Sequence, residues 1–232
     1  MSLFLPIRIH PEGWRFIGLF GAISFVLFYI CQPLGWVGII LTGWCAYFFR
    51  NPKRFTPVQD GLIISPADGI VCGIKQMTTP EEFGIGSNPC LRISIFLNVF
   101  DVHVNRIPIG GKILKSLYQP GQFLNAADEK ASEQNERQSL IIQVPNGPQI
   151  GVVQIAGLIA RRILCQAQEG DQVKTGETYG LIRFGSRMDI YLPEGIFPTI
   201  IEGQRMIAGE TIIADLSTKG TNQKHLREGV CH

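Results

Sequence analysis

The chain of 232 residues has few of the features that build metal sites or nucleic-acid-binding surfaces. Its four histidines form no cluster with cysteines at the spacing that a zinc site needs. Its 21 basic and 19 acidic residues leave a net charge of only +2, whereas nucleic-acid binding usually requires a concentrated basic face. We therefore expect neither a metal ion nor a nucleic-acid partner.

The sequence also lacks any Cys-x-x-Cys pair, and its six cysteines are scattered: Cys31, Cys45, Cys72, Cys90, Cys165 and Cys231. This spacing argues against a disulfide framework and predicts reduced thiols that face a cytosol-like compartment. With 45% hydrophobic residues, the chain can bury one substantial core, or one core together with a membrane element.

Charged residues are absent from residues 16 to 49, which read FIGLFGAISFVLFYICQPLGWVGIILTGWCAYFF. The sequence CQPLG divides this run into two arms, and each arm is shorter than the roughly 20 residues that a perpendicular transmembrane helix needs. We predict a helical hairpin that either spans a bilayer or dips into it, with Pro33 and Gly35 at its tip. Aromatic residues are available as interfacial anchors: Trp14, Trp36, Trp44, Tyr29 and Tyr47.

Basic residues flank the uncharged run on both sides. Arg8 and Arg15 precede it, and Arg50, Lys53 and Arg54 follow it, so the positive-inside rule places both ends in the cytoplasm. The rest of the chain is then expected at the cytoplasmic face of the cell membrane. A cleaved signal peptide fits poorly, because the second arm follows at once without a small-residue cleavage pattern. A buried hairpin in the core of a soluble protein is the remaining alternative.

From residue 62 onward, short strand-like runs are punctuated by glycine and proline, and one segment is repeated. EGDQVKTGET at 169 to 178 recurs as EGQRMIAGET at 202 to 211, and such units resemble the interlocking hairpins of biotinyl and lipoyl carrier domains. We predict a mostly β fold, a barrel-sandwich hybrid of two related halves, behind an N-terminal membrane hairpin. The expected parts are the hairpin with its basic flanks (1–54), the β domain (55–215) and a mobile tail (216–232). The polar stretch 125–138 is expected to be helical or loop-like.

A carrier-domain fold alone does not establish a function. Carrier domains present a modifiable lysine at a hairpin tip, whereas Lys174 lies in the turn DQVKTG. A noncatalytic membrane adaptor built from the same hairpins remains an alternative. It predicts an intact chain, and it gives no reason for the polar residues described next.

Polar residues alternate with apolar ones in the segment FDVHVNRIP. If residues 92 to 105 form a strand, Asp101, His103 and Asn105 share one face. Asp68, in SPADGIV, is a further candidate, although Pro-Ala-Asp-Gly is also ordinary turn chemistry. Gly185-Ser186 interrupts two strand-like runs, and a tight turn is its simplest interpretation.

Seven segments in order together resemble one enzyme family: FFRNPKR, SPADGIV, FLNVFDVHVNRIP, PGQFLNA, NERQ, GLIARRI and GDQVKTGETYGLIRFGSRMDIYLP. From about residue 14 to residue 215 the chain is similar to the short bacterial form of phosphatidylserine decarboxylase, which is made as a proenzyme. The resemblance implies self-cleavage between Gly185 and Ser186, with Ser186 becoming a covalent pyruvoyl cofactor. It implies that phosphatidylserine loses CO₂ through a Schiff base to that group and becomes phosphatidylethanolamine.

The resemblance also implies residue roles. Ser186 Oγ attacks the Gly185 carbonyl carbon, and an Asp-His-Ser arrangement is carried onto Asp68, His103 and Ser186, with His103 transferring protons. Asp101 is the local competitor for the partner of His103. Asn105 is a further candidate for substrate binding or support.

Longer members of the family carry a second histidine where this chain has Arg106, which is either a substrate-binding donor or a surface arginine. The implied partners are phosphatidylserine in an anionic membrane surface and the two chains of the cleaved proenzyme, with a homodimer left open. A decarboxylase of another serine phospholipid is an alternative. Deleting residues 1–49 is expected to spare self-cleavage.

Overall fold

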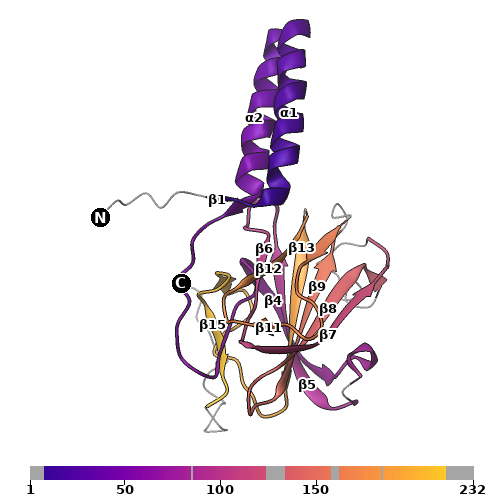
Figure 1. Cartoon of the computed structure of the whole chain (residues 1–232), viewed down its shortest axis with the longest axis vertical. Helices are drawn as coiled ribbons and strands as arrows, with labels where there is room; N and C mark the ends of the chain where they lie inside the picture. The colour runs from indigo at the N-terminus through magenta and orange to yellow at the C-terminus, as the bar shows by residue number, and fades with distance from the viewer. Residues whose placement is uncertain (1–7, 85, 124–133, 158–161, 184, 218–232) are drawn as a thin grey trace, which may run out of the picture.

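The computed structural model describes residues 8–84, 86–123, 134–157, 162–183 and 185–217. Two helices, α1 (Pro11–Ile30) and α2 (Gln32–Phe48), lie side by side and project from one end of a β domain (Figure 1). α1 begins where the His10 side chain accepts a hydrogen bond from the Glu12 N–H, and Pro11 occupies its first turn. α1 is long and apolar enough to cross a membrane.

The hairpin turns at Cys31, two residues before Pro33, the first residue of the predicted tip. Cys31 alone separates the helices, Pro33 lies in the first turn of α2, and Gly35 is buried within α2. Proline is favoured in a first helical turn, so it starts the second helix here and does not form the tip. A Cβ on Gly35 would overlap the ring of Phe28, so this glycine allows close approach of the two helices.

The β domain is built on an eight-stranded sheet with the order β11-β7-β8-β9-β13-β5-β4-β14. Its members are β4 (Gly69–Thr78), β5 (Pro89–Leu97), β7 (Gly111–Gln119), β8 (Arg137–Gln143), β9 (Gln149–Ala156), β11 (Gln172–Val173), β13 (Ser186–Pro193) and β14 (Arg205–Met206). All the pairings in this sheet are antiparallel, and β13 lies between β9 and β5 near its centre.

Smaller sheets complete the domain. One has the order β10-β12-β6, from Ile163–Cys165, Thr178–Ile182 and Val104–Arg106. The others pair β15 (Ile212–Asp215) with β3 (Leu62–Ile64) and β1 (Arg8–Ile9) with β2 (Arg50–Asn51), and a 3-10 helix, η1, covers Glu81–Phe83. Residues of the large and small sheets share the main core, including Ile95, Met188 and Ile182. The mostly β fold class is confirmed.

The repeated segments occupy equivalent places in the sheet. The first copy contains β11 at one edge, and the second contains β14 at the other edge. Val173 pairs with Gly111 at the start of β7, and Met206 pairs with Gly69 at the start of β4. A Cβ at either glycine would overlap a carbonyl oxygen of the neighbouring strand, so both halves need glycine at the same point.

The base of the hairpin is packed into the β domain. Phe48 and Phe49 are fully buried and share a core cluster with Val102, Val104 and Leu181. The His10 N–H also donates to Phe49 O at 2.8 Å, and β1 pairs with β2 beside it. The hairpin therefore contributes to the core beneath it, and its base touches the segment that carries His103.

Candidate active site

Ser186 begins β13, where the chain enters the centre of the large sheet. It pairs with Leu97 of β5 and Ala156 of β9. Its side chain is fully buried, and its Oγ has no hydrogen-bond partner among the described residues. Because buried polar atoms are normally paired, an unpaired serine hydroxyl at this point indicates a role other than packing.

Gly185 precedes this strand in a left-handed conformation with φ of +61°. A Cβ at this position would have no heavy atom within 4 Å, apart from its chain neighbours, so space is not the reason for glycine here. The backbone conformation is the reason, since other residues adopt it only with strain. The carbonyl of Gly185, which is bonded to the Ser186 nitrogen, thus lies in a turn that leads into β13 and has open space around its α-carbon.

His103 lies in the loop before β6 and is fully buried. Its Nδ1 is 3.0 Å from the main-chain oxygen of Asp101, and a carbonyl can only accept, so Nδ1 carries the proton. Nε2 is then the nitrogen with the free lone pair, and it has no partner within the described part of the chain. Burial lowers the pKa of His103 to about 4, which keeps the ring neutral at physiological pH, with the lone pair on Nε2 free.

The ring of His103 is supported by the hairpin. The Phe48 ring centroid lies 4.2 Å from that of His103, with the planes tilted by 35°. The main chain of His103 is also held, because the Ile182 N–H donates to His103 O at 3.4 Å. Only three residues separate Ile182 from Ser186, so the turn that carries Gly185 starts beside His103.

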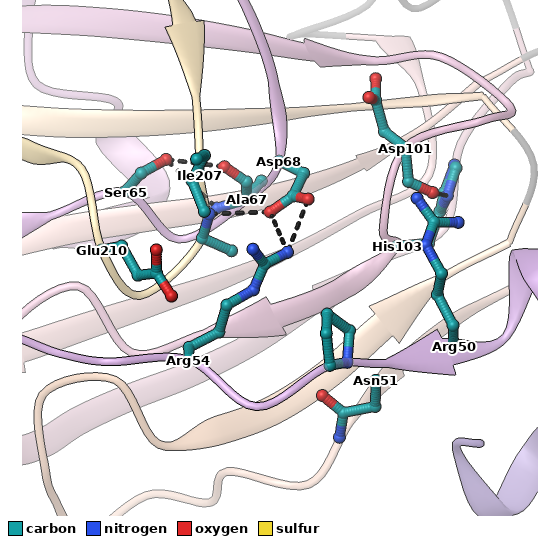
Figure 2. Close-up of polar contacts among 12 residues, drawn as sticks. Arg50, Asn51, Arg54, Ser65, Ala67, Asp68, Asp101, His103, Ile207 and Glu210 are labelled. Atoms are coloured by element: carbon teal, nitrogen blue, oxygen red, sulfur yellow. Dashed lines mark hydrogen bonds and ion pairs between the residues drawn. The ribbon is translucent and has the colours of Figure 1, made fainter. Parts of the chain in front are cut away.

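Asp68 is held by a different set of contacts. Arg54 Nη2 donates to both of its carboxylate oxygens, at 2.9 and 2.7 Å, and the Ala208 N–H donates to Oδ1 at 2.8 Å. Burial raises the pKa of Asp68, and the charge of Arg54 opposes that shift. Figure 2 shows the carboxylate pointing toward Arg54, and no hydrogen bond within the described residues joins it to His103.

Asp101 contacts His103 through its main chain rather than its carboxylate. The carboxylate accepts the Asn98 N–H at 2.9 Å and forms an ion pair with Arg205. These contacts hold the loop that presents the Asp101 carbonyl to the imidazole. The residue that fixes the ring is thus Asp101, the competitor named from the sequence, but through an atom that every residue possesses.

Asn105 lies in β6, and its side chain reaches a residue that the sequence did not single out. Gln154 of β9 donates from Nε2 to Asn105 Oδ1 at 2.8 Å, and both side chains are fully buried. Gln154 Nε2 also lies 2.9 Å from where a Cβ on Gly180 would stand. Asn105 Nδ2 and Gln154 Oε1 have no partner among the described residues.

Register places this pair near Ser186. Ala156 pairs with Ser186, and Gln154, two residues earlier on the same face of β9, pairs with Met188. Diagonal neighbours across antiparallel strands lie about 7 to 8 Å apart, so Gln154 links Asn105 to the neighbourhood of Ser186. One signal was available in the sequence, because Gln154 is a polar residue at an inward position of an otherwise apolar strand.

The Arg106 side chain is hydrogen-bonded mainly to the segment that follows the hairpin. Its guanidinium donates to Gly176 O at 2.9 Å, to Asn51 Oδ1 at 3.0 Å and to Pro52 O at 3.2 Å. Burial, and then the charge of Arg54, lower its pKa. These contacts tie β6 to residues 51 and 52.

Comparison with known proteins shows the family of the chain. The family model described as phosphatidylserine decarboxylase matches residues 41–214. Curated relatives named phosphatidylserine decarboxylase proenzyme include one from Ruegeria pomeroyi, 56% identical over 208 residues, which cover 90% of this chain and 95% of the relative. Those from Cereibacter sphaeroides and Beijerinckia indica are each 54% identical over 210 residues, covering 90% of both chains. The chain belongs to the phosphatidylserine decarboxylase family.

Proposed function

We propose that the chain is a proenzyme that cleaves itself between Gly185 and Ser186 and then decarboxylates phosphatidylserine to phosphatidylethanolamine and CO₂. One observation carries the proposal: Ser186 Oγ and His103 Nε2 are both buried and unpaired in the described structure, and Ile182, four residues before Ser186, donates its N–H to His103 O. A nucleophile and a neutral base without other partners are what the first step requires.

The first step exchanges an amide for an ester. Ser186 Oγ attacks the Gly185 carbonyl carbon while its proton passes to His103 Nε2, and the C–N bond breaks as that proton reaches the departing nitrogen. The Gly185 carbonyl is then esterified to the Ser186 side chain. Glycine at 185 adopts the left-handed turn without strain, and the space around its α-carbon is open.

The second step removes the proton on the α-carbon of residue 186. The electron pair forms a carbon–carbon double bond, and the Gly185 carboxylate leaves as the end of one chain. The residual dehydroalanine takes up water and releases ammonia, which leaves a pyruvoyl group at the start of the second chain. The residues fit this group, since position 186 is fully buried at the head of a central strand and its Oγ has no partner among the described residues.

When formed, the pyruvoyl group supplies a carbonyl that binds the substrate amine and accepts the electrons left by CO₂. His103 holds a proton-accepting Nε2 at this point, and we propose that it also returns a proton to the substrate carbon. Asp101 fixes the imidazole through its carbonyl oxygen. Asp68 is proposed as the carboxylate that acts with His103 in processing, and Asn105 as a supporting donor.

The membrane supplies the substrate in this proposal. A phospholipid with two acyl chains stays in its leaflet, and the hairpin holds the β domain against that surface, at the cytoplasmic face of the cell membrane. Basic residues at the hairpin's base favour an anionic lipid, at about 1 kcal/mol for each side chain near the surface.

A direct assay tests the proposed activity. Full-length protein in vesicles that contain carboxyl-labelled phosphatidylserine should release labelled CO₂ and accumulate phosphatidylethanolamine, and the Ser186→Ala protein should do neither. A wild-type protein that is cleaved but releases no CO₂ would show that phosphatidylserine is not its substrate. A wild-type protein that remains one intact chain would favour the adaptor alternative.

A further inference from the structure

The loop of residues 98–101 presents an aromatic side chain to the outside on a rigid support. Phe100 is 60% exposed, and its N–H donates to Asn98 Oδ1 at 2.8 Å. The Asp101 N–H donates to Asn98 O at 3.0 Å, while the Asn98 N–H donates back to the Asp101 carboxylate. These bonds close the loop on itself, so Phe100 is displayed by a structured turn.

Arg50 ties this loop to the end of the hairpin. Its Nη2 donates to Phe100 O at 2.7 Å, and its Nη1 donates to Tyr47 O in the last turn of α2 at 2.8 Å. The guanidinium also lies 3.7 Å from the centre of the Tyr47 ring. Tyr47 is half exposed, and so is Trp14 in the first turn of α1. Three aromatic side chains and a cation therefore gather at the base of the hairpin.

A second cation lies on the other side of the loop. Arg205 forms an ion pair with the Asp101 carboxylate, yet its side chain remains 59% exposed. The loop is thus flanked by two guanidinium groups, Arg50 and Arg205, whose geometry suits phosphate and carboxylate. Aromatic rings beside such cations are typical of protein surfaces at the level of lipid head groups.

The helices above this level indicate a bilayer rather than a protein partner. Large apolar side chains are exposed along both helices: Leu19, Ile23, Phe25, Val26, Ile30, Val37, Ile39, Ile40 and Leu41. A protein partner would have to surround the hairpin along its whole length to cover them, whereas lipid does so without any specific contact. The base of the hairpin, where it meets the β domain in Figure 1, is then the membrane surface.

We propose that Trp14, Tyr47, Arg50 and Phe100 form a collar that contacts lipid at the head-group level, with Phe100 as its contribution from the β domain. The inference deepens the proposed function and rests on the hairpin lying in a bilayer. His103 follows Phe100 by three residues and contacts Asp101 of the same loop. The collar therefore brings the imidazole to the layer that holds the substrate's head group.

Photo-crosslinking in intact protein tests the collar without requiring catalysis. p-Benzoylphenylalanine is placed at position 100 and at two controls. The negative control is Val58, fully exposed between β2 and β3, and the positive control is Val37 of α2. Each full-length protein is reconstituted in vesicles of phosphatidylglycerol and phosphatidylcholine, irradiated, and analysed by mass. We expect lipid adducts at positions 100 and 37 and none at 58.

The outcomes separate the two proposals. Adducts at 37 but not at 100 would overturn the collar and leave the membrane hairpin standing. No adduct at 37 would overturn both, because the hairpin would not lie in lipid. Equal adducts at 58 and 100 would also overturn the collar, since contact would then be unspecific.

A kinetic comparison adds a functional measurement. Phe100→Ser should lower kcat/KM on phosphatidylserine vesicles by about tenfold, the effect of roughly 1.4 kcal/mol of lost apolar contact. The loss should be much smaller on a short-chain, water-soluble phosphatidylserine, and Phe100→Leu should restore most of the vesicle activity. Equal losses on both substrates would show that Phe100 only supports the loop.

Discussion

His103 Nδ1 lies 3.0 Å from the carbonyl oxygen of Asp101, two residues earlier in the same loop. A main-chain acceptor fixes the tautomer of the ring, so that Nε2 is the basic nitrogen. The local backbone thus orients His103 for the proton-transfer role proposed for it, and the ring is kept neutral by burial beneath the hairpin.

The first prediction concerns the titration of this ring. In uncut Ser186→Ala protein, imidazole nitrogen shifts should show the Nδ1–H tautomer at pH 7 and a protonation midpoint near 4. The unfolded state would bind its proton near pH 6.5, so His103 should make folding more stable as pH rises from about 4 to 6.5, by about 3 kcal/mol. A midpoint near 6.5 would show that the ring is open to water.

The second prediction separates the two candidate carboxylates. Asp101→Asn keeps the carbonyl that binds His103 and a side-chain oxygen that can accept the Asn98 N–H. It loses the charge that pairs with exposed Arg205, so its effect on cleavage should be small. Asp68→Asn leaves Arg54 buried without its carboxylate partner and should slow cleavage strongly. Pulse-chase of newly made precursor measures both rates.

The control for that comparison is Glu82→Gln, which breaks the partly buried ion pair with Arg137 elsewhere in the β domain. If Glu82→Gln slows cleavage as much as Asp68→Asn does, Asp68 acts through stability alone. If Asp101→Asn slows cleavage more than Asp68→Asn does, Asp68 is not the carboxylate that acts with His103.

The third prediction concerns the glycine beside Gln154. A methyl group on Gly180 would overlap Leu164 O and lie 2.9 Å from Gln154 Nε2, so Gly180→Ala should displace Gln154 and leave Asn105 Oδ1 unpaired. We expect a loss of about 1–3 kcal/mol of unfolding free energy and slower cleavage. Gly73→Ala, in open space on β4, should be close to neutral in both measurements. Similar losses in the two variants would contradict this account of Gly180.

The fourth prediction concerns the hairpin's base. Phe48→Ala should leave a cavity beside His103, cost about 3–5 kcal/mol, and raise the imidazole's protonation midpoint as water enters. Phe55→Ala, at an exposed position, should change neither quantity.

Because Phe48 packs on His103, deletion of residues 1–49 should impair self-cleavage, contrary to the expectation from sequence. Normal cleavage of the truncated chain would show that the β domain positions His103 alone.

Local patterns predicted the features that depend on local chemistry. The uncharged run predicted a helical hairpin. The repeat of EGDQVKTGET predicted two related units, and these form the opposite edges of one sheet. Gly185-Ser186 does lie at a turn, as the simplest interpretation of that dipeptide predicts, and the turn leads into the central strand.

Contacts between distant segments could not be predicted in this way. Asp68 pairs with Arg54, His103 packs on Phe48, and Gln154 reaches Asn105, and each contact joins residues whose proximity depends on the whole sheet order. The hairpin tip was misplaced for a local reason, because Pro33 suits a first helical turn as well as a loop.

The central claim is tested most directly by running the purified protein on a denaturing gel and measuring the mass of each chain. We predict two chains, residues 1–185 and 186–232, with the second lighter by one ammonia than a chain that begins with serine. Ser186→Ala should give one uncut chain, whereas Ser139→Ala, at another fully buried serine of the same sheet, should be cut normally. A single intact wild-type chain, or normal cleavage of Ser186→Ala, would contradict the account.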